Sequence, residues 1–235
     1  MIGVGFLPNS GQMGRLWEST LISIGERPET NILLTAATPL GPSRLMKSRT
    51  KLVRVLKFEA LSARRARMFA ASARLYQGWK ESYVFDKNNQ SYRDPAHRNS
   101  DWAPIGAVPA LDLAWNAEVI PDALEIARCY YGVSGVEPTD PGIIRYKPGG
   151  FFKPHRDCSP DPIASRRVLT VVLYLNANFS GGRTIFHDLD HFEKPTTGAC
   201  VVFPSKVLHS GEAIKTGSKI IVVGWLSTPV QPNIG

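Results

Sequence analysis

The chain has 235 residues, 43% hydrophobic and 20% charged, which fits a globular protein with one main domain and an elaborate periphery. No run approaches about 18 consecutive apolar residues, which excludes a membrane-spanning helix, and the first residues lack the pattern of a secretory signal. Cys129, Cys158 and Cys200 form no C-x-x-C pair, which argues against a disulfide framework and against a zinc ribbon. We therefore expect a reducing compartment, the cytoplasm.

The net charge of +8 is concentrated in one segment. Residues 44–74 contain ten lysines and arginines against one glutamate, or +9, so the rest of the chain sums to −1. Such a stretch can contact nucleic acid, an anionic membrane or an acidic partner. We favour a simpler interpretation, in which it is the solvated face of one helix and the residues that lead into it.

The first half of the chain contains few regular elements. Residues 1–50 show no sustained period and are interpreted as an N-terminal extension of unknown role. Residues 52–58 alternate apolar with basic side chains and predict a strand. Ser62 is the expected N-cap of an amphipathic helix over 63–76 that packs on a larger body.

Two further segments precede the part of the chain that is rich in predicted strands. Residues 86–110 are polar and broken by prolines, which predicts a long loop of the kind that often forms a lid. Residues 118–131 predict a second helix with Pro121 near its first turn. From residue 142, short β-branched and aromatic runs alternate with turn residues, which is typical of a sandwich or barrel. A parallel sheet is disfavoured because no helical stretch interrupts these runs.

The stretch "FKPHRD" places His155 and Asp157 two positions apart. On a strand, residues i and i+2 point the same way, so both side chains can reach one point. A metal site needs a third ligand, and the other histidines are His97, His187, His191 and His209. Two histidines and one carboxylate form the facial ligand set of non-haem Fe(II) oxygenases, which leaves positions open for a 2-oxo acid and O2.

A 2-oxo acid co-substrate has a distal carboxylate, whose burial requires a charge-assisted partner. Lys219 stands ten residues after His209, beyond a turn signal at "KTGS". A strand, a turn and a returning strand would place Lys219 beside the metal pocket.

The motifs "RYKPGGFFKPHRD", "RRVLTVVLYLN", "GGRTIF", "GACVVFPSKVLHSG" and "GSKIIVVGWL" follow one another in this order. Together they resemble the 2-oxoglutarate- and Fe(II)-dependent dioxygenases, specifically the prolyl 4-hydroxylase-like group. The resemblance is strong over 142–226, loose over 52–141 and absent over 1–50. It implies a mainly β (α+β) fold: a double-stranded β-helix, or jelly roll, with flanking N-terminal helices. One dioxygenase domain would span 51–228, followed by a tail over 229–235.

The resemblance also implies roles for single residues. The iron ligands would be His155, Asp157 and His209, and the contacts to 2-oxoglutarate would be Tyr146, Thr184 and Lys219. Candidate substrate contacts are Arg167, for which a structural salt bridge is an equal alternative, and Arg98 and Trp102, which would otherwise tether the predicted loop. Trp225 is expected to have a packing role.

The chain departs from the family at one motif, because Arg183 stands where Gly-Gly-x-Thr usually has glutamate. This change could alter the rim of the pocket without touching the iron ligands. His187 and His191 do not have the family spacing to Asp157, and we interpret them as polar residues of an edge strand or loop.

The implied function is hydroxylation of an unactivated C–H bond, with a prolyl residue of a protein or peptide as the favoured substrate and succinate and CO2 as co-products. Fe(II), 2-oxoglutarate and O2 would be required, with ascorbate as an optional reductant. A free amino acid or another small molecule is an alternative substrate, and a non-catalytic jelly-roll binding module is an alternative of another class. A nucleic-acid substrate is disfavoured, because such relatives hold 2-oxoglutarate with a C-terminal arginine and no arginine follows Lys219. The oligomeric state stays open.

Overall fold

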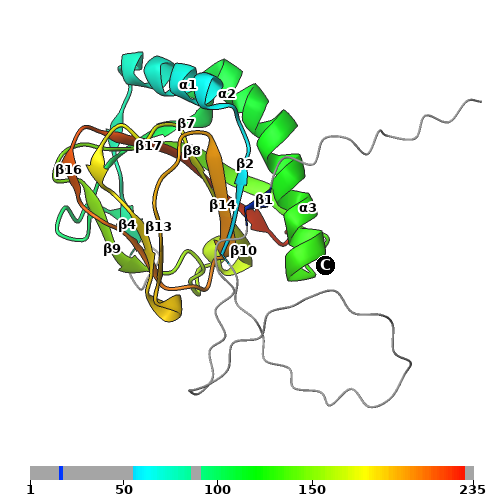
Figure 1. Cartoon of the computed structure of the whole chain (residues 1–235). Helices are drawn as coiled ribbons and strands as arrows, with labels where there is room; N and C mark the ends of the chain where they lie inside the picture. The colour runs from blue at the N-terminus through cyan, green and yellow to red at the C-terminus, as the bar shows by residue number, and fades with distance from the viewer. Residues whose placement is uncertain (1–15, 18–54, 86–90, 231–235) are drawn as a thin grey trace, which may run out of the picture.

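The computed structural model describes residues 16–17, 55–85 and 91–230. In these residues two antiparallel sheets face each other, and the α-helices pack on the outer face of the larger sheet (Figure 1). The mainly β class and the jelly-roll arrangement agree with the prediction, as does the absence of parallel pairing among the described strands. None of the described helices is long and apolar enough to cross a membrane.

The larger sheet has eight strands in the order β1-β2-β14-β10-β17-β8-β7-β3. They are β1 (Leu16–Trp17), β2 (Leu56–Glu59), β3 (Lys80–Glu81), β7 (Asp101–Pro104), β8 (Glu137–Tyr146), β10 (Arg167–Tyr174), β14 (Ala199–Pro204) and β17 (Lys219–Ser227). The three central strands come from the runs "GIIRY", "VLTVVLYLN" and "KIIVVGWL", so the strongest β signals of the sequence form the middle of the sheet.

The smaller sheet has five strands in the order β13-β12-β15-β9-β6. They are β6 (Arg98–Asn99), β9 (Phe151–His155), β12 (Thr184–Phe186), β13 (His191–Glu193) and β15 (His209–Gly211). Two short pairs complete the β structure: β4 (Val84–Phe85) with β5 (Ser91–Tyr92), and β11 (Ser180–Gly181) with β16 (Ile214–Thr216). The smaller sheet matters for function because two of its strands end at the predicted metal ligands.

Successive residues of the central strands point alternately to two separate hydrophobic clusters, as the period of a strand requires. In β10, Leu169, Val171 and Leu173 pack against the helices. The alternate residues Val172 and Tyr174 point between the two sheets. The space between the sheets is therefore bounded by side chains of both, and it contains the site.

Helix α1 (Ala63–Leu75) begins where the sequence predicts, with the Ser62 hydroxyl accepting a hydrogen bond from the Arg65 amide. The second helical segment is longer than predicted. It starts at Pro109 with α2 (Pro109–Ala114), continues through a π-helical turn over Trp115–Val119 and becomes α3 (Ile120–Tyr131). The widened turn, in which the Ile120 amide donates to the Trp115 carbonyl, lets Pro121 lie inside a continuous helix without the usual clash with the preceding turn.

The predicted loop over 86–110 is wrong for its second half. Residues 98–99 and 101–104 form β6 and β7, which pair with β9 and β8. Two of its three prolines lie at the end of β7 and at the start of α2, and Pro95 lies in a turn. The pairing is long-range, so local composition did not reveal it. The short one-turn helices are Ile105–Ala107, Ala164–Arg166 and His187–Leu189.

Most of the predicted N-terminal extension and the tail from residue 231 lie outside the described residues. Leu16–Trp17 form β1, which pairs with β2. Of the predicted strand over 52–58, residues 52–54 lie outside the described residues, and the observed strand starts at Leu56. Part of the basic stretch lies among the described residues. Arg64, Arg67 and Arg74 are exposed on α1, and Arg65 pairs with Glu118.

Candidate active site

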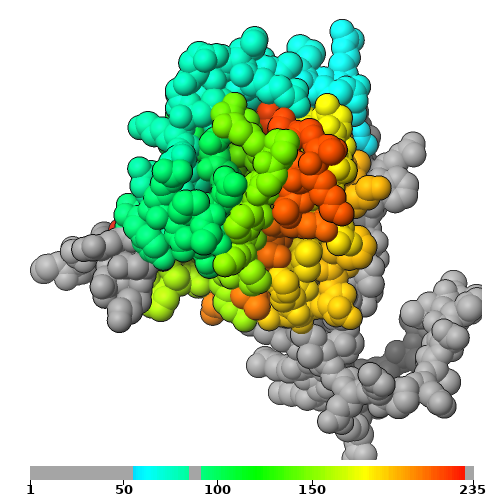
Figure 2. Space-filling model, turned by 90° about the vertical axis from the view of Figure 1, so that its left-hand side faces the viewer, coloured from blue at the N-terminus to red at the C-terminus, as the bar shows by residue number. Residues whose placement is uncertain are grey.

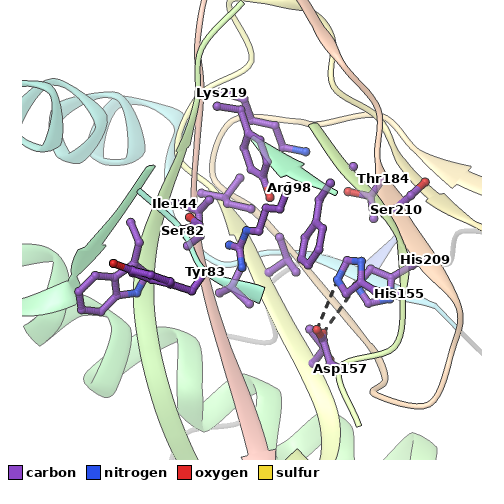
Figure 3. A pocket seen from close by; sticks show the side chains of 18 of the residues that line it. Ser82, Tyr83, Arg98, Ile144, His155, Asp157, Thr184, His209, Ser210 and Lys219 are labelled. Carbon is purple, nitrogen blue, oxygen red and sulfur yellow. Dashed lines mark hydrogen bonds and ion pairs between the residues drawn. The ribbon is translucent and has the colours of Figure 1, made fainter. Parts of the chain in front are cut away.

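The three predicted metal ligands come together at the ends of two neighbouring strands. His155 ends β9 and is the direct partner of His209, the first residue of β15. Asp157 follows two positions later, beyond the end of β9 (Figure 3). The potential ligand atoms lie within 4.8 Å of one another. His155 Nε2 is 3.5 Å and His209 Nε2 is 3.6 Å from the Asp157 carboxylate.

Hydrogen bonds to the backbone orient both imidazoles. His155 Nδ1 lies 2.8 Å from the Lys153 carbonyl oxygen, and His209 Nδ1 lies 2.9 Å from the Val207 carbonyl oxygen. A carbonyl can only accept, so each Nδ1 carries a hydrogen, and each Nε2 faces the carboxylate and is the nitrogen left to bind a metal. This arrangement would orient both imidazoles for a metal ion before it binds.

The charges also suit a cation. Burial raises the pKa of Asp157, but His209, His155 and the Thr170 hydroxyl outweigh it and hold the carboxylate well below its usual range. Burial lowers the pKa of His209 to about 4, against the opposing effect of Asp157. At neutral pH His209 is therefore neutral and Asp157 is anionic. With His155 they form the two-nitrogen, one-oxygen donor set that Fe(II) takes in non-haem oxygenases.

A cavity of about 480 Å³ opens above these ligands between the two sheets. It contains a second charged group, Lys219, whose side chain is 3% exposed. Lys219 Nζ donates to the Gly182 carbonyl at 2.8 Å and forms no ion pair within the described part of the chain. Burial lowers its pKa to about 7, with Glu212 opposing. A buried ammonium without a carboxylate partner is costly, so this end of the cavity fits an anionic ligand.

The other residues predicted to contact 2-oxoglutarate surround the same ammonium. Tyr146 is the direct cross-strand partner of Lys219. Thr184 lines the cavity, and its hydroxyl lies 2.8 Å from that of Tyr174. Tyr146 and Tyr174 also present their rings to Lys219 Nζ, at 5.6 and 5.4 Å. Hydroxyl groups and one ammonium together fit the distal carboxylate of 2-oxoglutarate.

The predicted substrate contacts occupy different places. Arg98 and Trp102 line the cavity, and Trp102 is 37% exposed. Arg167 does not line it. Its guanidinium stacks on Trp225 at 3.5 Å, and Nη2 lies 3.7 Å from Asp140. In this structure Arg167 therefore has the salt bridge that was the alternative to a substrate contact.

Figure 2 shows the face on which teal and green residues of the segment that contains β3 and β6 lie beside the yellow-green residues around β9. Lys80, Tyr83 and Trp102 from this segment line the cavity. The segment therefore forms one wall of the site.

Several site residues were not predicted. Thr170 donates to Asp157 Oδ2 at 2.7 Å, and Phe152 stacks on His155 with centroids 3.5 Å apart. Trp225, expected only to pack, lines the cavity and has a buried Nε1 with no partner among the described residues. Thr170 could have been found from the sequence, because it stands two positions before Val172 in the same strand and therefore points to the same, inward face.

His187 and His191, which the sequence did not favour as metal ligands, lie outside the metal cluster. His187 Nε2 is 2.9 Å from the Ser210 hydroxyl, and His191 Nε2 is 3.1 Å from Glu193. Arg183 pairs with Glu212 and covers the ring of Phe192. Arg183 is not among the residues that line the cavity.

A jelly roll with a two-histidine, one-carboxylate cluster between its sheets defines the class of the non-haem Fe(II) oxygenases. Residues 141–227 match the model of the 2OG-Fe(II) oxygenase superfamily. The family implies Fe(II) and 2-oxoglutarate, and the residues just described fit both.

Among curated relatives, a PKHD-type hydroxylase of Prochlorococcus marinus is 32% identical over 89 residues, covering 36% of this chain and 40% of the relative. Prolyl 4-hydroxylase 1 of Arabidopsis thaliana is 27% identical over 110 residues, covering 36% and 39%. The chain thus spans about two fifths of the length of these relatives.

Solved structures support the fold. A prolyl-4-hydroxylase of Pseudomonas putida has a TM-score of 0.57 at 24% identity, covering 75% of this chain and 93% of that one. A prolyl hydroxylase of Trichoplax adhaerens, in complex with a hypoxia inducible factor peptide fragment, has a TM-score of 0.58 at 17% identity, covering 74% and 83%.

Proposed function

We propose that this protein is a 2-oxoglutarate- and Fe(II)-dependent hydroxylase of an unactivated C–H bond. The observation that carries the proposal is the presence in one cavity of the cluster His155, Asp157 and His209 and of the buried Lys219 ammonium, which has no carboxylate partner among the described residues. The cluster supplies a metal site with positions left open, and the ammonium supplies a site for a carboxylate.

In this proposal the three ligands hold Fe(II), while Lys219, Tyr146 and Thr184 hold the distal carboxylate of 2-oxoglutarate. When bound, the iron and 2-oxoglutarate together supply an oxidation that consumes O2 and yields succinate, CO2 and a hydroxylated product. The protein's own contribution is geometric: backbone carbonyls fix the two imidazoles, and Thr170 fixes the carboxylate. The wall formed by Tyr83 and Trp102 would exclude water and aim the substrate.

We infer that the substrate is a prolyl residue of a protein or peptide. The support is the similarity to prolyl 4-hydroxylases in sequence and to prolyl hydroxylases in fold. A free amino acid or another small molecule is the competing substrate, because one fold serves many substrates. A cytoplasmic location belongs to the same proposal and rests on the cysteine usage.

The first test requires no substrate. Purified protein is titrated anaerobically with Fe(II) and then with 2-oxoglutarate, and the visible spectrum is recorded. We expect a weak metal-to-ligand charge-transfer band that is absent in His155→Ala and requires far more 2-oxoglutarate in Lys219→Ala. Lys206→Ala, which removes an exposed lysine outside the cavity, is the control. Folded protein that binds Fe(II) but forms no band would reject the proposal and favour a non-catalytic module.

With the band established, prolyl peptides and free amino acids are compared by succinate formation and by mass spectrometry of the products. Addition of one oxygen atom to a prolyl residue would support the inferred substrate. Turnover of free amino acids alone would replace it with the small-molecule alternative.

A further inference from the structure

Five of the described arginines are half-buried, and four of these pair with a carboxylate. The four pairs are Arg145 with Asp101 at 2.8 Å, Arg166 with Glu137 at 3.6 Å, Arg167 with Asp140 at 3.7 Å and Arg183 with Glu212 at 2.8 Å. Arg98 is the fifth, and it forms no ion pair with any acidic residue in 55–85 or 91–230. A partly buried guanidinium without an anion is an exception that requires a reason.

The Arg98 side chain is fixed in place by its surroundings. Its Nε donates to the Ser100 hydroxyl at 3.0 Å, and Ser100 in turn donates to Ser82 at 2.8 Å. Its guanidinium lies 4.5 Å above the ring of Phe152. These contacts use Nε and one face of the group, and a further hydrogen bond joins the guanidinium to the Tyr146 hydroxyl. The remaining N–H donors are left to bind a carboxylate in the cavity that Arg98 lines.

Arg98 also lies close to the reaction centre. The Phe152 ring, which lies against the Arg98 guanidinium on one side, stacks on the predicted metal ligand His155 with centroids 3.5 Å apart. One aromatic ring therefore separates the cation from the ligand. An extended chain advances about 3.5 Å per residue, so an anion bound to Arg98 belongs to the reacting residue or to a residue within about two positions of it.

Two of the cavity's cations are at least partly buried and lack a carboxylate partner among the described residues: Lys219 and Arg98. A third, Lys80, is exposed. In Figure 3 the Arg98 side chain extends from the region of Lys219 towards Tyr83. Lys219 lies at the buried end and is assigned to the co-substrate. The position of Arg98, between that end and the exposed wall, leaves it available for the substrate.

We propose that Arg98 binds a carboxylate of the substrate. The hydroxylated residue would then carry a free α-carboxylate or lie within about two positions of an aspartate or glutamate. This inference rests on the proposed hydroxylase function and narrows its substrate class.

The test compares substrates that differ only in one negative charge. One arm is a library of short peptides that contain a fixed proline with varied neighbours, and it is read by sequencing the oxygenated products with mass spectrometry. The other arm is a pair of small molecules, N-acetyl-L-proline and N-acetyl-L-prolinamide, together with free L-proline and L-prolinamide. Binding to protein loaded anaerobically with Fe(II) and 2-oxoglutarate is measured by tryptophan fluorescence, because Trp102 and Trp225 line the cavity.

We expect acidic neighbours, or the free carboxylate, to improve binding and turnover by about ten-fold or more over the neutral counterpart, as a charge-assisted hydrogen bond would. Arg98→Gln should remove this preference while the 2-oxoglutarate midpoint of the charge-transfer band stays within about two-fold. Arg98→Glu should reverse the preference towards lysine neighbours. Lys80→Gln, which removes an exposed cation of the same cavity, is the matched control and should keep the preference.

The peptide arm and the small-molecule arm separate an acidic side chain from an α-carboxylate as the source of the charge. Equal use of the charged and neutral members, or no acid-dependent signal in either arm, would overturn the inference. So would a large rise of the 2-oxoglutarate midpoint in Arg98→Gln, because Arg98 would then serve the co-substrate. In each of these cases the charge-transfer band of the unmodified protein is present, whereas failure of the proposed function itself would abolish the band.

Discussion

Thr170 and Asp157 are joined by a hydrogen bond of 2.7 Å, in which the threonine hydroxyl donates to the carboxylate Oδ2. That hydroxyl has one hydrogen, so the Ser205 hydroxyl, 3.0 Å away, must be the donor in their contact. The Ser205 carbonyl in turn accepts from the Asp157 amide. A strand of the larger sheet thereby holds a metal ligand that follows a strand of the smaller one.

Replacing this hydroxyl should weaken metal binding without unfolding the protein. In Thr170→Val the carboxylate loses a donor, and we expect Fe(II) affinity to fall by about 10- to 100-fold, the usual cost of removing a group that orients a ligand. Thr170→Ser keeps the donor and should recover most of the affinity. Anaerobic metal titration measures both. Equal affinities in the three proteins would show that Asp157 is oriented without Thr170.

Burial of Lys219 makes the stability of the metal-free protein dependent on pH. Its pKa is about 7 in the folded chain against 10.5 for the ordinary group. Between these values the unfolded state binds more protons, so the free energy of unfolding rises with pH, by roughly 2 kcal/mol between pH 7 and 9. Below about pH 7 both states are protonated, and the full cost of burying the charge remains.

Lys219→Met isolates this effect, because it removes the ionising group and leaves the other titrating groups. Urea unfolding at pH 7 and pH 9, without metal or 2-oxoglutarate, should show the variant more stable than the unmodified protein at pH 7 and the difference shrinking at pH 9. A difference that does not change with pH would mean that Lys219 is already solvated in the folded state.

Gly142 allows Trp102 to lie against β8. A Cβ at this position would lie 2.3 Å from Trp102 Nε1, and the indole would have to move. Because the indole is 37% exposed, we expect Gly142→Ala to change stability by less than about 1 kcal/mol while shifting the tryptophan emission and weakening substrate binding. Gly106→Ala, where an added Cβ meets nothing within 4 Å, is the control. An unshifted emission spectrum in Gly142→Ala would contradict this packing.

The N-cap of α1 gives a prediction about stability alone. Ser62→Ala removes the hydroxyl that accepts from the Arg65 amide at 3.4 Å, and we expect a loss of about 0.5–1 kcal/mol in urea unfolding. Ser72→Ala, at an exposed position inside the same helix, should be neutral or slightly stabilising. A larger loss at Ser72 than at Ser62 would refute the assigned helix start.

The sequence by itself determined the local features of this protein. The two-residue period of a strand put His155 and Asp157 within reach of one point, and Ser62 marked the start of α1. The order and spacing of the motifs indicated a jelly roll and singled out His209 and Lys219. Each of these inferences depends on neighbours in the chain or on a resemblance carried by short motifs.

Only the tertiary structure decided which distant segments share the site. The hydrogen-bond donor to Asp157 is Thr170, from a strand of the other sheet. Tyr83 and Trp102, from another part of the chain, line the cavity. The segment with Arg98 looked like a loop, yet its strands pair with β8 and β9. Whether Arg98 had an acidic partner also depended on the fold. Strand pairing joins residues far apart in sequence through backbone hydrogen bonds, which leave little trace in local composition.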